Sequence, residues 1–93
     1  MLGISVARKG DQLVIRWQLT RIAISMDTIV SVTHDETYAG EIKDAIRIGT
    51  PQGTTDRIVI RTQDAAYILF TTNADSIQNS INRYMEEHLK ASS

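Results

Sequence analysis

The sequence contains no cysteine and only one proline, Pro51, among its 93 residues. Without cysteine there is no disulfide, and small secreted domains usually depend on disulfides for stability. We therefore expect a cytoplasmic protein. No apolar run approaches the roughly 18 residues of a membrane-spanning helix, and the first ten residues lack the apolar core of a signal peptide.

An excess of charge of one sign is also missing. Ten Lys and Arg residues face eleven Asp and Glu residues, and the formal net charge is −1. Proteins that bind nucleic acid cluster their cations to neutralise phosphates, whereas the basic residues here are scattered. The sequence thus predicts a partner other than nucleic acid. Its length fits one domain, which we expect to span residues 1–93.

What the sequence does contain is a repeated alternation of apolar and polar side chains. This two-residue period predicts short strands at residues 2–7, 13–18, 21–25, 30–35, 46–48, 57–61 and 67–70. Trp17 is expected in the core, and Gly10 in the turn of the first hairpin. The glycines at 49 and 53 predict a hairpin turn, because no Lys-Ser/Thr follows as in a phosphate loop. Residues 67–70 are apolar on both parities, which predicts a strand that is covered on both faces or one on which the helix packs.

The period changes near Asn73, which is a good N-cap residue. Beyond it, side chains suited to one buried helix face recur at intervals of three or four residues: Ile77, Ile81, Tyr84, Met85, His88 and Leu89. This spacing predicts a helix over about residues 74–90. Seven short strands bend into a barrel or an orthogonal sandwich, and the helix would cover its open mouth.

This element order is that of a pleckstrin-homology-like (PH-like) domain. Several stretches also resemble the bacterial PH-like family typified by the sublancin immunity protein, the SunI/YnzG group: residues 13–19, 29–32, 35–40, 45–51, 53–60 and 67–73. The resemblance implies a mostly β fold, a PH-like barrel of seven antiparallel strands capped by one C-terminal helix. It brings no catalytic residue. The immunity protein carries an N-terminal membrane anchor that we expect to be absent here, so a role related to bacteriocin immunity stays open.

The histidines give little support for catalysis or metal binding. His34 precedes Asp35 and Glu36, but adjacent residues of a strand point to opposite faces and do not easily share one metal. An enzyme would need a deep pocket that joins His34 to carboxylates, and the sequence shows no sign of one. We therefore predict a non-enzyme without cofactor or metal.

A binding role rests on two groups of residues. Tyr38 beside Gly40, in a predicted loop, either contacts a partner or folds back onto the barrel. Arg47 and Arg57 have the opposite parity to their neighbouring isoleucines, so they form either a solvated face or a recognition face. We predict a module that binds a protein, a peptide or a second copy of itself. The segment 41–50 and the first strand are the candidate edges for an added strand.

The alternative is weak peripheral attachment to an anionic membrane through the first hairpin. Arg8, Lys9 and Arg16 would then contact the lipid head groups. This basic pattern is incomplete, because the next alternate position holds Gln18 rather than a cation.

Overall fold

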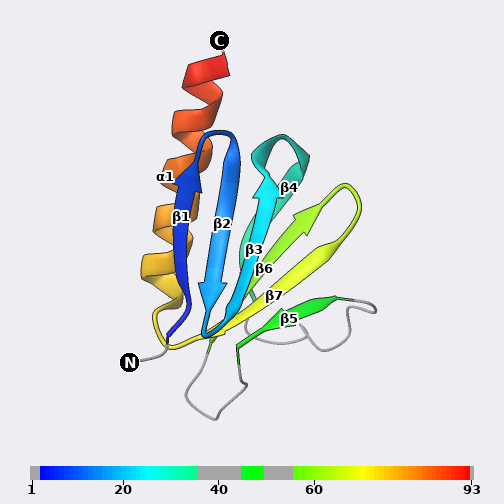
Figure 1. Cartoon of the computed structure of the whole chain (residues 1–93), viewed down its shortest axis with the longest axis vertical. Helices are drawn as coiled ribbons and strands as arrows, with labels where there is room; N and C mark the ends of the chain where they lie inside the picture. The colour runs from blue at the N-terminus through cyan, green and yellow to red at the C-terminus, as the bar shows by residue number, and fades with distance from the viewer. Residues whose placement is uncertain (1–2, 36–44, 50–55, 93) are drawn as a thin grey trace.

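The computed structural model of the chain describes residues 3–35, 45–49 and 56–92. These residues form seven strands, one 3-10 turn and one helix, in the order shown in Figure 1. The elements are β1 (Ser5–Lys9), β2 (Gln12–Trp17), β3 (Thr20–Ser25), η1 (Met26–Thr28), β4 (Ile29–Asp35), β5 (Ile46–Ile48), β6 (Asp56–Thr62), β7 (Ala66–Thr71) and α1 (Ala74–Ser92). The predicted mostly β fold with one C-terminal helix is confirmed.

The strands lie in two sheets, one with the order β1-β2-β3 and one with the order β4-β6-β7-β5. Most neighbours are antiparallel, but β5 pairs with β7 in parallel, with Ile46 opposite Tyr67. The prediction that all seven strands are antiparallel is therefore wrong for this pair. Since β6 runs against β7, the chain reverses direction twice between β5 and β7, and the two strands run the same way. The alternation of side chains cannot reveal which strands are neighbours.

The core lies between the two sheets and is closed on one side by α1. Side chains of β2, β6, β7 and α1 meet there without solvent exposure, among them Leu13, Ile15, Ile58, Ile60, Leu69 and Ile81. Helix α1 packs against β1, β4 and β6, at the left of the view in Figure 1. The carbonyl of Asn73 accepts the first helical hydrogen bond from the N–H of Ile77 at 3.0 Å, so the helix begins where the sequence predicts.

Strand β7 is buried on both faces, as its sequence predicts. Ile68 and Leu69 are both 0% exposed although adjacent strand residues point to opposite sides. Leu69 belongs to the main core. Ile68 packs in a second small cluster with Val59, Ala45 and Phe70 on the other face of the sheet.

Three apolar side chains depart from their predicted environment. The register of β4 against β6 shifts between Ile29 and Ser31, so Val30 occupies a bulge and is 69% exposed. Leu89 is 66% exposed although the adjacent His88 is buried, so it lies on the solvent side of the last turns of α1. Trp17 packs against the core but is only partly buried. Its place at the end of β2, next to the turn, explains this exposure.

Candidate functional site

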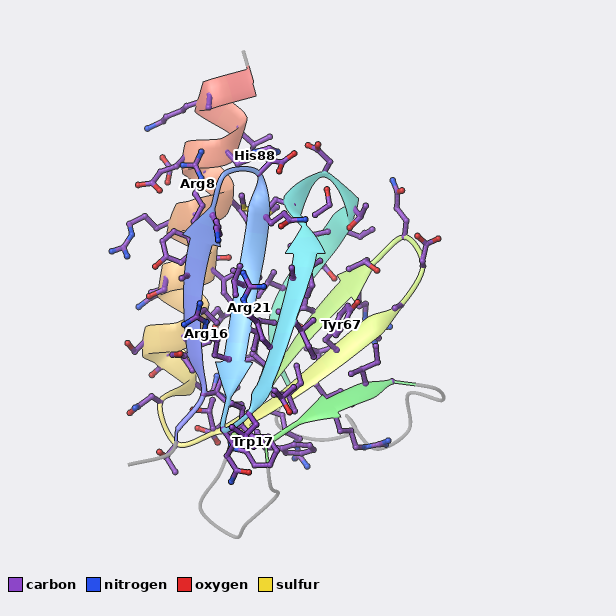
Figure 2. All side chains as sticks on the ribbon, in the orientation of Figure 1. Arg8, Arg16, Trp17, Arg21, Tyr67 and His88 are labelled. Atoms are coloured by element: carbon purple, nitrogen blue, oxygen red, sulfur yellow. The ribbon has the colours of Figure 1, made fainter. Side chains whose placement is uncertain are left out.

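The outer face of the β1-β2-β3 sheet, which points away from the core, carries the first group of candidate residues. Register places Ala7, Val14 and Ala23 in one row across this face. The row towards the β2–β3 turn brings Arg16 directly opposite Arg21. Figure 2 shows both arginine side chains over the same face of the sheet. Two arginines thus occupy paired positions on neighbouring strands.

The three cations predicted for the first hairpin do not converge. Arg8 has the parity of the core-facing residues, and its Nη1 atom lies 3.4 Å from Oε1 of Glu87 on α1. Its Nε atom also donates a hydrogen bond to the carbonyl of Gly10 at 2.9 Å. Lys9 and Arg16 lie on the outer face, but Lys9 pairs with Gln12 at the opposite end of β2. Four residues of strand separate the two ends by roughly 13 Å.

Of the four residues predicted to bind a partner, the structure describes Arg47 and Arg57. Tyr38 and Gly40 lie outside the described residues. Arg47 stands opposite Ile68 in the ladder, and Arg57 stands opposite Phe70. Both arginines therefore share the face of the second sheet that holds the small apolar cluster, as their parity predicts. Strand β7 lies between them.

His34 lies between two carboxylates that are distant from it in sequence. Its Nε2 atom is 3.7 Å from Oδ2 of Asp56, and its Nδ1 atom is 3.8 Å from Oδ1 of Asp75. Both distances exceed those of a hydrogen bond. Among residues 3–35, 45–49 and 56–92 no three side chains are arranged to hold a metal ion. The arrangement supports a weak electrostatic contact between β4, β6 and the start of α1.

The edges of the sheets form the second group of candidate features. Strands β1 and β3 end one sheet, and β4 and β5 end the other. Strand β5, within the segment predicted as an edge, does end its sheet, and three of its described residues pair with β7. Strand β1 also ends its sheet, as predicted, but α1 packs against it. Strand β4 is interrupted by the bulge at Val30.

Strand β3 differs from the other three edge strands. Its six residues pair with β2 in one continuous register from Thr20 to Ser25. It contains no proline and no bulge, which are common protections of an exposed edge. The sequence did not reveal this edge, because the ends of a sheet depend on pairing between distant segments.

Comparison with known proteins identifies the family. The family described as the SunI-like bacterial PH domain matches residues 2–83. A UPF0457 protein of Geobacillus thermodenitrificans is 53% identical over 90 residues, which cover 97% of each chain. A UPF0457 protein of Bacillus thuringiensis subsp. konkukian is 54% identical over 83 residues, which cover 88% of this chain and 99% of the relative.

A third relative carries one of the names that the resemblance suggested. The UPF0457 protein YnzG of Bacillus subtilis is 49% identical over 81 residues, which cover 87% of this chain and 98% of YnzG. No solved structure matches the chain significantly. Among the described residues, no helix combines the length and apolar character needed to cross a bilayer. The extent of the family match and the identity with these relatives show that the chain belongs to the family of SunI-like bacterial PH domains.

Proposed function

We propose that this protein is a non-catalytic cytoplasmic module that binds an extended segment of a protein or peptide along β3. The observation that carries the proposal is the uninterrupted edge of β3, which ends its sheet over six residues. An edge strand presents N–H and C=O groups that can pair with an added strand. Backbone pairing supplies affinity in this mode, and alternate side chains supply specificity.

The side chains beside this edge indicate the partner sequence. On the inner side, Ile22 is partly buried and packs against the core together with Trp17 and Tyr67. An apolar side chain of the added strand would extend this layer and lose contact with water. On the outer side Arg21 is exposed, and a carboxylate of the added strand would lie next to it. The best partner is therefore an extended segment that alternates apolar and acidic residues.

A second copy of the chain is one form that this partner can take. Two β3 strands paired in antiparallel would join two three-stranded sheets into one. Arg21 of each copy would then gain no carboxylate, so we expect self-association to be weak. The first-hairpin membrane alternative has less support, because Arg8 already contacts Glu87 and the other two cations lie far apart on the outer face.

The test uses the isotope-labelled chain and a hexapeptide with alternating Val and Glu, compared with a peptide of scrambled order. We expect the alternating peptide to shift the amide resonances of Thr20–Ser25 and to slow their hydrogen exchange. Ala23→Pro should abolish the effect because it removes an N–H from the strand, whereas Ala23→Ser keeps the N–H and should retain it. Shifts confined to β5 or to the first hairpin would contradict the proposal.

A further inference from the structure

The turn between β2 and β3 exposes an apolar side chain at its end. Trp17 and Thr20 are paired residues, so the turn consists of Gln18 and Leu19 alone, which we name the tip. Leu19 is fully exposed. Gln18 has a φ of 53°, in the left-handed region that residues with a Cβ rarely adopt.

Gln18 is not a residue that the turn itself favours at this position. Two-residue hairpin turns with a positive φ prefer Gly, Asn or Asp, because these residues tolerate that conformation. Leu19 contributes nothing to the core, since its side chain stays in water. Departures from local turn chemistry, as at Gln18, are expected at functional or strained sites. The tip is suited to a contact outside the domain.

The two charged residues of β2 and β3 next to the tip, Arg16 and Arg21, are both positive. Arg16 precedes Trp17 on β2, Arg21 follows Thr20 on β3, and the two arginines are paired across the strands. No carboxylate occurs in the chain between Asp11 and Asp27. Neither arginine forms an ion pair within the described residues. Like charges directly opposite in a sheet are destabilising, so an anion bound between them would relieve a cost of the free protein.

The apolar, aromatic and basic residues of this hairpin end lie at increasing distance from the tip. Leu19 is outermost, Trp17 follows, and the backbone positions of Arg16 and Arg21 come next, roughly 7–10 Å along the strands. A membrane surface has the same order from inside to outside: hydrocarbon, an interfacial layer that favours tryptophan, and the anionic phosphates. Interfacial segments bury their apolar groups to a depth of roughly 5–10 Å, which agrees with the length of this hairpin end.

We propose that the tip docks on an anionic phospholipid surface. Leu19 enters the boundary between head groups and acyl chains, and Arg16 and Arg21 contact the phosphates. A single leucine exposed on all sides suits a deformable apolar medium better than a folded protein, which would have to supply a matching pocket. This surface goes beyond the proposed peptide edge, because it uses the end of the hairpin; the two surfaces share Arg21.

The chain contains one tryptophan, and its position next to the tip makes it a reporter. Vesicles of phosphatidylcholine with about one-third phosphatidylserine should shift the Trp17 emission to shorter wavelength, and brominated lipids should quench it. Leu19→Asn should weaken binding about tenfold or more, because the apolar transfer is lost. Arg16→Gln and Arg21→Gln should each weaken it about fivefold, and more salt should weaken the wild type.

Two control variants keep the interpretation specific. Leu89→Asn removes another exposed leucine, and Lys9→Gln removes a cation from the far end of the outer face; both should bind as the wild type does. Wild-type binding by Leu19→Asn, or no binding of the wild type at low salt, would overturn the proposal. A fluorescence shift with an acidic peptide but not with vesicles would overturn it in favour of a protein partner. Ala23→Pro, which tests the peptide edge, should not alter vesicle binding.

Discussion

The Nε2 atom of His88 lies 2.7 Å from Oδ1 of Asp27. The histidine side chain, on the late part of α1, is only 9% exposed, whereas Asp27 belongs to η1 and is 69% exposed. A carboxylate only accepts hydrogen bonds, so the histidine nitrogen must be the donor. This bond ties the C-terminal part of the helix to the corner between the two sheets.

Breaking this bond should loosen the helix. We expect His88→Ala and Asp27→Ala each to lower the free energy of unfolding by about 1–2 kcal/mol, since a hydrogen bond to a charged group is lost. In urea titrations the double variant should be less destabilised than the sum of the two single variants. Lys90→Ala, which removes the exposed pair with Glu86 at 3.3 Å, serves as the control and should cost less than about 0.5 kcal/mol. Strict additivity would contradict a direct His88–Asp27 bond.

The buried face of α1 should account for most of the helix's contribution to stability. Ile81 is fully buried among residues of both sheets, and its replacement by alanine should cost about 2–5 kcal/mol. Leu89→Ala removes a similar side chain from the exposed side and should change stability by less than about 0.5 kcal/mol. Thermal or chemical unfolding followed by circular dichroism measures both. Equal effects of the two substitutions would show that the helix is not docked through Ile81.

Gly49 follows β5 and permits a close approach of two backbones. Its φ is +92°, and a Cβ built there would lie 2.7 Å from the carbonyl oxygen of Phe70. Gly10 also has a positive φ, +65°, but a Cβ there would meet open space. Gly49→Ala should therefore be the more damaging substitution, with a loss of about 2–4 kcal/mol against about 1 kcal/mol for Gly10→Ala. If the two variants unfold at the same denaturant concentration, the close approach to Phe70 is incorrect.

The sequence predicts the strands and the helix because those elements depend on local periodicity. The two-sided burial of Ile68 and Leu69 also follows from the sequence, since an apolar run without alternation has no polar face. The parallel pairing of β5 with β7 does not follow, because alternation carries no information about neighbours. The bond between His88 and Asp27, 61 residues apart, is equally hidden.

In the candidate site, too, local features follow from the sequence and contacts between distant residues do not. Parity correctly places Arg47 and Arg57 on one face of their sheet. It does not show that Arg8 is held by Glu87, a contact over 79 residues. The sequence does not single out Leu19 and Arg21, because a short connection between strands has no period. The signal that was available is the pair of arginines on both sides of Leu19, in a stretch without carboxylates.

Arg21→Glu separates the requirements of folding from those of membrane docking. In the wild type Arg21 stands opposite Arg16, and the two like charges repel each other. A glutamate there would form a cross-strand ion pair with Arg16, so we expect the free energy of unfolding to rise by about 0.2–1 kcal/mol. The same change removes one cation from behind the tip and adds an anion, so binding to anionic vesicles should fall further than for Arg21→Gln. Urea titration and vesicle sedimentation of one preparation give both values. A variant that is more stable and still binds vesicles like the wild type would show that the arginine pair has no part in docking.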